Sequence, residues 1–379
     1  MLTAEAAVRP FRMDQGERQF ASMAFLWPAF AAETTSELAA AAAREFVKLA
    51  IGPDAEKPPA HEPQWTTPNK ILLELPAVRL RDFSTRPDGA TTLVCAPFAL
   101  HGATIVDFAP HHSLVAALQS AGLNRVFVTD WRSATPEMRL WSIDDYLAAL
   151  NVLVDELGGG VDLIGLCQGG WMALIYAARF PEKVRRLVLA GAPIDIAAGK
   201  SRLSELTCNT PTALFTELVA LGEGRVLGHH MLQFWAPEIE RDEMYCLLEP
   251  ATAMDSAPFR DLEWRFRDWY ASTVDLPGTY YLQVVGQLFK ENRLAAGEFV
   301  ALGHRIDLSR LRCPLFLLAA RDDDIVVPEQ IFATEHLVDR ARCPGAKALA
   351  PCGHLGLFMG RNILSAVWPE VACWLSQPA

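Results

Sequence analysis

The chain has 379 residues, of which 51% are hydrophobic and 21% charged, and its net charge is −11. This length suits one large α/β domain with an insertion, or two domains, and the even spread of charged residues argues against a disordered chain. The acidic balance argues against a general nucleic-acid-binding protein, because such a protein would carry a basic patch, but it does not exclude an anionic small substrate.

Eight cysteines are scattered along the chain without a C-x-x-C pair, so the sequence indicates neither a zinc site nor a disulfide framework. Scattered cysteines in a chain of this size are typical of a reducing cytosol. Residues 1–20 lack the charged-then-apolar pattern of a signal peptide, and no apolar run approaches the roughly 20 residues of a membrane span. We therefore expect a cytoplasmic protein without a transmembrane segment.

The first 65 residues are predicted to form a helical segment and a linker. Residues 33–50 are rich in alanine with helical periodicity, and residues 52–65 are rich in proline, which is typical of a surface connection. Two interpretations of the helix stay open: it packs as an ordinary helix, or it contacts a binding partner.

From residue 70 the chain alternates between strand-like and helical segments. We expect one or two strands in 70–83, strands at 91–97, 124–131, 161–166 and 184–191, and helices at 112–122, 142–158 and 168–180. This alternation predicts parallel βαβ units and an open, doubly wound, mostly parallel sheet.

The alternation stops at residues 198–300, which are mostly helical in pattern and rich in large aromatic side chains. It resumes with strands at 313–320 and 346–352 and with helices near 328–338 and at 363–375. We therefore expect an α/β core formed by 66–197 and 301–379, with 198–300 inserted as a helical lid over the carboxyl edge of the sheet, where such sheets bind ligands. The aromatic residues of the insertion either line a dry pocket or are ordinary packing.

The stretch GLCQG at residues 165–169 follows a predicted strand and has the G-x-S-x-G spacing of a hydrolase nucleophile turn, with sulfur in place of the serine oxygen. Its glycines are needed because a tight turn leaves no room for side chains at those two positions. Gln168 begins the next helix, so its backbone N–H can point at a developing oxyanion, and the helix N-terminus favours a thiolate at Cys167. The alternative is that Cys167 is a small buried hydrophobic residue.

Two further residues follow strand ends in the chain order of α/β-hydrolases, which is nucleophile, acid, histidine. Asp323 lies in the acidic stretch 321–326 after one strand, and His354 follows the next strand. We expect His354 to accept the proton of Cys167, and Asp323 to orient His354 and stabilise its positive form. Which of the acids Asp322–Asp324 has this role stays open, and the three could instead form a solvated turn or a hard-cation site. We expect no metal, since no other carboxylate cluster joins them.

The loop after the first parallel strand is expected to provide a second oxyanion donor, most simply the backbone N–H of Phe98 or Ala99. His101 in the same loop is a candidate for the edge of the substrate site, with an acid–base role as the alternative. Cys352 lies close in sequence to the predicted catalytic histidine, and it is either a packing residue or a secondary reactive thiol.

Longer stretches of the chain resemble the polyhydroxyalkanoate synthases. They are IGLCQGG at 164–170, FPEKVRRLVLAGAPIDI at 180–196, the stretch 289–328, and CGHLGLFMG at 352–360. The resemblance, which covers most of residues 70–376, implies an α/β-hydrolase fold, a triad on Cys167, His354 and Asp323, and polymerisation of 3-hydroxyacyl-CoA with no cofactor beyond the CoA thioester that is the substrate. The short synthases that work with a partner subunit fit best in size. A partner subunit or a homodimer, and contact with a polyester granule, are therefore also implied.

Some positions depart from that family, and other stretches resemble a second one. Asp324 stands where the synthases usually have histidine, and Trp171 where they tend to have a small residue. The stretches 94–104, 191–195 and 277–285 resemble the intracellular polyhydroxyalkanoate depolymerases, which are similar thiol enzymes without the full G-x-C-x-G-G box. The intact box in this chain favours the synthase.

We therefore predict a thiol acyltransferase that polymerises 3-hydroxyacyl-CoA to polyhydroxyalkanoate through an acyl-enzyme at Cys167. A thiolate suits exchange with a CoA thioester because the attacking and leaving sulfurs are comparable. The acceptor then decides the product: a 3-hydroxyl group lengthens a polyester, whereas water or CoA shortens it, as in a depolymerase acting by hydrolysis or thiolysis at the same triad. Another thioesterase or acyltransferase, and a non-catalytic protein of the granule surface with a decayed site, are the further alternatives.

Overall fold

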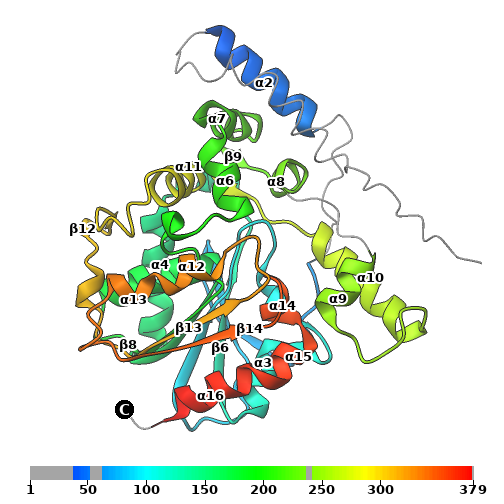
Figure 1. The fold of residues 1–379 in the computed structure, drawn as a ribbon, viewed down its shortest axis with the longest axis vertical. Helices are drawn as coiled ribbons and strands as arrows, with labels where there is room; N and C mark the ends of the chain where they lie inside the picture. Colours follow the sequence, from blue (N-terminus) through cyan, green and yellow to red (C-terminus); the bar gives the residue numbers. More distant parts are fainter. Residues whose placement is uncertain (1–36, 52–61, 236–240, 378–379) are drawn as a thin grey trace, which may run out of the picture.

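A computed structural model of the protein describes residues 37–51, 62–235 and 241–377, and an eight-stranded sheet forms its centre (Figure 1). The strand order is β1-β2-β6-β3-β7-β8-β13-β14. The strands are β1 (Lys70–Glu74), β2 (Val78–Asp82), β3 (Thr91–Cys95), β6 (Arg125–Trp131), β7 (Val161–Leu166), β8 (Val184–Ala190), β13 (Leu315–Ala320) and β14 (Gly345–Ala350). Every neighbouring pair from β6 to β14 is parallel, and β2 runs antiparallel to β1 and β6. The predicted mostly parallel sheet is confirmed.

The central strands are buried on both faces, which explains their continuous apolar sequences. Every residue of β3, β7 and β13 is buried, whereas the edge strands β1 and β14 contain exposed residues. Successive residues of a strand point to opposite faces. Accordingly, Leu163 and Leu317 belong to one hydrophobic core, and Ile164 and Leu318 to the other.

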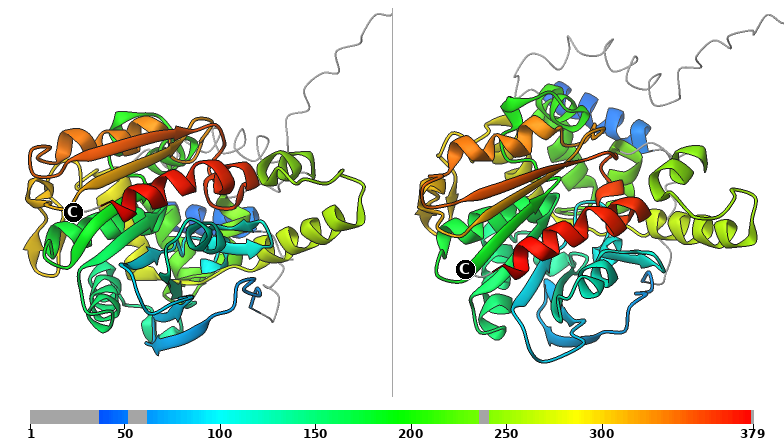
Figure 2. Two further views of the ribbon diagram at one scale, coloured as in Figure 1. Left: turned by 90° about the horizontal axis from the view of Figure 1, so that it is seen from below. Right: turned by 60° about the horizontal axis from the view of Figure 1, so that its bottom comes forward.

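Helices cover the two faces of the sheet. They are α3 (Leu114–Ser120), α4 (Ile143–Glu156), α5 (Gln168–Arg179), α12 (Pro328–Phe332), α13 (Thr334–Leu337), α14 (Gly356–Met359), α15 (Arg361–Ala366) and α16 (Trp368–Ser376). Buried residues of α4 and α5 fill one core, and those of α3 and α16 fill the other. Figure 2 shows α16 lying along one face of the sheet. The sheet is therefore doubly wound, as the sequence predicts.

Two predicted helices are each divided in the structure. The helix predicted at 363–375 is α15 followed by α16, and Pro369 stands in the first turn of α16. Proline has no N–H to donate to a preceding turn, but it fits the start of a new helix. The helix predicted near 328–338 is likewise divided, at Ala333, into α12 and α13. The single helices that we predicted at these two places are therefore wrong.

The chain between β8 and β13 is mainly helical, and we call its helices α6 to α11 the lid. They are α6 (Arg202–Asn209), α7 (Thr212–Leu221), α8 (Gly228–Trp235), α9 (Arg241–Leu248), α10 (Ala257–Ala271) and α11 (Gly278–Gln283), followed by a π-helical turn at Val284–Lys290. In Figure 1, α9 and α10 form a pair beside the other lid helices. The sequence did not predict the short pairs β9 (Arg225–Val226) with β10 (Leu276–Pro277), β11 (Val300–Ala301) with β12 (His304–Arg305), and β4 (Asp107–Ala109) with β5 (His112–Ser113), because two or three residues show no periodicity.

The lid meets the core at loops that follow three parallel strands. The backbone N–H of Val274 donates to the carbonyl of Leu100, after β3, at 2.9 Å. The Tyr280 hydroxyl accepts from the Gln168 amide, after β7, at 2.9 Å. The Arg202 N–H donates to the carbonyl of Asp324, after β13, at 2.8 Å. These contacts join the inserted segment to residues that follow β3, β7 and β13. That this segment is a lid over the carboxyl edge, with boundaries at 198 and 300, stays a prediction.

Helix α2 (Glu37–Ile51) packs against the lid. Its Ala43 and Val47 share a small hydrophobic core with Leu214 and Leu218 of α7, and Arg44 forms a 3.3 Å ion pair with Glu217 of α7. The predicted helix 33–50 is therefore confirmed from residue 37, while residues 33–36 lie outside the described residues. Of the predicted linker 52–65, residues 52–61 also lie outside them.

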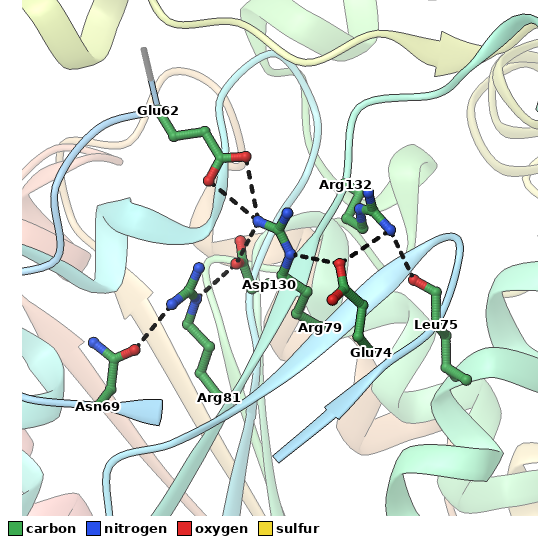
Figure 3. Close-up of polar contacts among 8 residues, drawn as sticks. All are labelled: Glu62, Asn69, Glu74, Leu75, Arg79, Arg81, Asp130 and Arg132. Atoms are coloured by element: carbon green, nitrogen blue, oxygen red, sulfur yellow. Dashed lines mark hydrogen bonds and ion pairs between the residues drawn. The ribbon is translucent and has the colours of Figure 1, made fainter. Parts of the chain in front are cut away.

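Ion pairs connect the antiparallel edge of the sheet to the segment that precedes it (Figure 3). Arg81 of β2 donates to the Asp130 carboxylate of β6 at 2.6 Å. Arg79 donates to Glu74 and Glu62, each at 3.1 Å. The side chains of Asp130 and Arg81 are only 15% and 11% exposed, whereas that of Glu62 is 76% exposed. Loss of the Asp130 carboxylate would therefore leave the largely buried Arg81 without its ion-pair partner.

We expect Asp130→Ala to lower the free energy of unfolding by about 2 kcal/mol, because it leaves Arg81 desolvated without its carboxylate. Urea unfolding followed by circular dichroism measures this loss. The matched control is Glu62→Ala, which removes an exposed partner and is expected to cost about 0.5 kcal/mol or less. Equal losses in the two variants would show that burial does not set the value of this network.

Candidate active site

Cys167 occupies a sharp turn between β7 and α5. Its φ of 48° and ψ of −117° are unusual for a residue with a side chain, and such a conformation costs about 1–3 kcal/mol. The turn is held by the backbone on both sides, because the Cys167 N–H donates to the carbonyl of Ala190 and the Cys167 carbonyl accepts from the Gly170 N–H, each at 2.9 Å. This strand–turn–helix geometry is that of a nucleophile elbow.

Three glycines allow the elbow to form. A Cβ atom at Gly169 would lie 2.2 Å from the carbonyl oxygen of Cys95, and one at Gly170 would lie 2.3 Å from Cβ of Ala192. A Cβ at Gly165 would lie 2.6 Å from Cα of Gly170. The sequence predicted small residues at 165 and 169, and the structure adds 170 for the same steric reason.

Asp323 and His354 lie together after β13 and β14. The Asp323 carboxylate accepts from the backbone N–H groups of Ile325 and Val326 at 2.9 and 2.8 Å, and its other oxygen lies 2.7 Å from Nδ1 of His354. Asp323 is 4% exposed, whereas its two acidic neighbours are exposed. Of the three adjacent acids, the structure therefore places Asp323 against the histidine.

The His354 side chain is 9% exposed and lies between the carboxylate and the thiol. Burial by itself lowers the pKa of His354, but the charges of Asp323 and Cys167, with hydrogen bonds to both, raise it, and the net pKa lies well above the ordinary value of 6.5. Because Nδ1 faces Asp323, Nε2 is the atom available to the thiol. This arrangement can move a proton from the Cys167 sulfur to His354.

We predicted the backbone N–H of Phe98 or Ala99 as an oxyanion donor, but the Phe98 N–H is hydrogen-bonded to the side chain of Gln168. Its Oε1 accepts from this N–H at 3.0 Å, so the Phe98 N–H already has a partner. The expectation that Phe98 donates freely is therefore corrected. The backbone N–H of Gln168 lies in the first turn of α5, where no preceding turn offers a carbonyl. The N–H groups of Gln168 and Ala99 are the candidates that keep their predicted role.

His101 packs against the lid. Its ring centroid lies 4.5 Å from that of Trp269 and 4.9 Å from that of Tyr270, and its backbone forms a β-bridge with Thr273. Burial lowers its pKa to about 4, against a smaller opposing effect of a hydrogen bond to the backbone of Ser272. His101 is therefore neutral near pH 7, and its geometry is that of a contact between lid and core.

Cys352 is the cysteine nearest to His354 in the sequence. Burial raises the pKa of Cys352 to about 12, and the nearby charges of Glu249, Asp323 and Asp322 add to this effect. Such a thiol stays protonated, which favours the packing interpretation of Cys352. All eight cysteines, which lie within the described residues, are unpaired.

Across residues 37–51, 62–235 and 241–377, no group of three or more His, Cys, Asp or Glu side chains is arranged to hold a metal ion. In the same part of the chain, no helix has both the length and the apolar character needed to cross a bilayer.

Comparisons with known proteins give a family and a set of relatives. A family model described as "Protein of unknown function (DUF3141)" matches residues 73–344. The poly(3-hydroxyalkanoate) polymerase subunit PhaC of Synechocystis sp. is 28% identical over 283 residues, which cover 72% of this chain and 74% of that protein. The polymerase subunit PhaC of Allochromatium vinosum is 26% identical over 304 residues, which cover 77% of this chain and 84% of that protein. These relatives confirm the resemblance found in the sequence.

Solved structures identify the fold. The crystal structure of the Paleococcus ferrophilus monoacylglycerol lipase matches 79% of this chain and 98% of that one, with a TM-score of 0.52 and 17% identity. Similarity at this level of identity shows the fold alone. The predicted α/β-hydrolase fold is confirmed.

We expect Gly169→Ala to destabilise the protein by more than about 3 kcal/mol, because the new methyl group would overlap a backbone oxygen that cannot move aside. Thermal unfolding and the yield of folded protein measure this effect. The control is Gly286→Ala, where the nearest atom to an added Cβ is Glu291 Oε1 at 4.0 Å. A stable Gly169→Ala variant would contradict the tight approach of α5 to β3.

We expect the stability that His354 contributes to depend on pH. A histidine whose pKa is raised by folding stabilises the folded state fully below its unfolded pKa, near 6.5, and loses this contribution as the pH rises through the raised value. The difference in unfolding free energy between wild type and His354→Gln should therefore be largest in mild acid and shrink in alkali.

Urea unfolding across this pH range measures the difference, and the exposed His304→Gln is the control. If the difference grew toward alkali, the direction of the His354 pKa shift would be wrong.

Proposed function

The chain belongs to the DUF3141 family, and we propose that it is a polyhydroxyalkanoate synthase-like acyltransferase that works through a thioester at Cys167. The observation that carries this proposal is the combination of a cysteine at the nucleophile elbow with the hydrogen-bonded His354–Asp323 pair. The polymerase names of the relatives support the same activity.

In the first half of the reaction, Cys167 becomes acylated. Asp323 holds the His354 ring, and His354 takes the thiol proton as the Cys167 sulfur attacks the thioester carbonyl of a 3-hydroxyacyl-CoA. The backbone N–H groups of Gln168 and Ala99 stabilise the oxyanion that forms. The bond to CoA then breaks, and the departing sulfur takes the proton from His354. One thioester is exchanged for another, so this half-reaction is nearly balanced.

In the second half, a hydroxyl group accepts the acyl unit. The 3-hydroxyl of another acyl unit or of a growing chain loses its proton to His354 and attacks the Cys167 thioester. An ester bond forms, the carbon–sulfur bond breaks, and the Cys167 thiol regains the proton. A lid that excludes water from the site would prevent hydrolysis of the acyl-enzyme, and this supports transfer of the acyl unit to a hydroxyl group. The CoA thioester is the substrate, and these steps use no other cofactor.

The proposed partners follow from the same function. The relatives named above are polymerase subunits, which supports a partner subunit or a second copy of this chain. A growing polyester would place the enzyme at a granule surface in the cytoplasm, and size-exclusion chromatography with and without acyl-CoA tests for assembly.

The decisive assay supplies 3-hydroxybutyryl-CoA and, separately, amorphous polyester. Release of CoA together with growth of polymer, measured by a thiol reagent and by gel-permeation chromatography, is the expected result. Release of 3-hydroxy acid from the polyester without polymer growth would identify a depolymerase and contradict the proposal.

We expect Cys167→Ser to lower the rate of CoA release by about a thousandfold, because an alcohol gives up its proton much less readily than a thiol and makes a poorer leaving group. The same CoA-release assay measures this loss. The matched control is Cys352→Ser, which changes a nearby thiol outside the proposed chemistry and should keep the rate within about twofold. A large loss in the Cys352 variant with an active Cys167 variant would reverse the assignment of the nucleophile.

A further inference from the structure

The side chain of Gln168 connects three parts of the molecule. It is buried, with only 6% of the residue exposed. Its Oε1 accepts from the Phe98 N–H at 3.0 Å, and its Nε2 donates to the Tyr280 hydroxyl at 2.9 Å. The Tyr280 hydroxyl in turn donates to the sulfur of Met172 at 3.7 Å. One amide thus spans the elbow, the loop after β3 and helix α11 of the lid.

We propose that the Gln168 side chain is a positioning residue, which holds the loop after β3 in place for the acyl oxyanion and links that loop to the lid. This inference rests on the proposed acyl-enzyme at Cys167. The residue has two separate functions in this proposal: its backbone N–H faces the oxyanion, and its side chain fixes the loop that carries the other donor, Ala99.

Further contacts hold Ala96 and Phe98 in the loop after β3. The Ala96 N–H donates to Thr129 Oγ1, and the Ala96 carbonyl accepts from Trp131 Nε1, each at 3.0 Å. The Phe98 ring stacks on Tyr146, with centroids 4.7 Å apart, and contacts Tyr280 at 5.2 Å. The contact with Gln168 fixes the peptide that directly precedes Phe98, next to the elbow, and the neighbouring Ala99 peptide depends on it.

A glutamine is suited to this place because it accepts and donates from one group. A hydrocarbon side chain would leave the Phe98 N–H buried without an acceptor, which is unfavourable and favours rotation of the peptide. Burial is the largest effect that raises the pKa of Tyr280, well above 10, so its hydroxyl stays protonated and can accept from Gln168 while donating to Met172.

Two reactions of Cys167 separate positioning of the loop from reactivity of the thiol. Acylation by para-nitrophenyl butyrate forms a carbon–sulfur bond and releases para-nitrophenolate through an oxyanion, whereas alkylation by iodoacetamide displaces iodide without one. Both products are counted by mass spectrometry of the peptide that carries Cys167, because the exposed Cys208, Cys246 and Cys373 can also react with iodoacetamide. Both reactions depend on the reactivity of the Cys167 thiol, so changes in the thiol or in His354 cancel in the ratio of the acylation rate to the alkylation rate. This ratio therefore measures how well the N–H donors stabilise the oxyanion.

We expect Gln168→Leu to lower this ratio at least tenfold while the alkylation rate stays within about twofold of wild type. Gln168→Glu should recover toward acid, because a protonated carboxyl can accept from Phe98 and donate to Tyr280, as the amide does. Tyr280→Phe keeps the bond to Phe98, so a smaller loss of about two- to fivefold is expected. The matched control is Gln119→Leu, whose amide donates to the Phe83 carbonyl at 2.6 Å away from the elbow, and it should leave the ratio unchanged.

An unchanged ratio in Gln168→Leu, or an equal fall in acylation and alkylation, would overturn the inference. If that variant does not fold, the acid recovery of Gln168→Glu decides, and a ratio that does not recover would equally overturn it. Failure of the proposed function would give a different result, namely a wild-type protein that is acylated but elongates no polymer from 3-hydroxybutyryl-CoA. The ratio of the two rates would then still test the role of Gln168.

Discussion

The close approach of α5 to β3 and β7 is the constraint on which the rest of the site depends. At Gly169 the helix comes so near to the backbone of Cys95, and at Gly170 so near to the Cβ atom of Ala192, that no side chain fits. The chain turns sharply at Cys167, between β7 and the first turn of α5, with a φ of 48° and a ψ of −117°. The strain at Cys167 is tolerated because the backbone of β8 and the first turn of α5 hold the turn from both sides.

The parallel sheet explains why distant residues meet at this turn. Parallel strands end at one edge, so the loops after β3, β7, β13 and β14 lie side by side although they are separated by long stretches of sequence. Asp323 is fixed there by two backbone N–H groups before it contacts His354, so the histidine receives an orientation that is already set. At the same edge, Val274 and Tyr280 form hydrogen bonds with Leu100 and Gln168.

The features that depend on residues close together in the sequence could be predicted from the sequence. The apolar strand β7, the spacing around Cys167 and the chain order of Asp323 and His354 could all be recognised from the residues. The choice among three adjacent acids needed the structure, because only burial distinguishes Asp323. The contact of Gln168 with Phe98 could not be predicted, since the two residues lie 70 positions apart and a side-chain amide has many possible partners.

Helix α2 is attached to the lid instead of the core, through Ala43 and Val47 against α7. The last helix, α16, belongs to the core beneath the sheet. The two helices nearest the ends of the described chain, α2 and α16, therefore belong to different parts of the molecule, the lid and the core. A donor fluorophore on the exposed face of α2 and an acceptor on α16 would measure the separation of lid and core directly, in a single protein molecule and without a label in the active site.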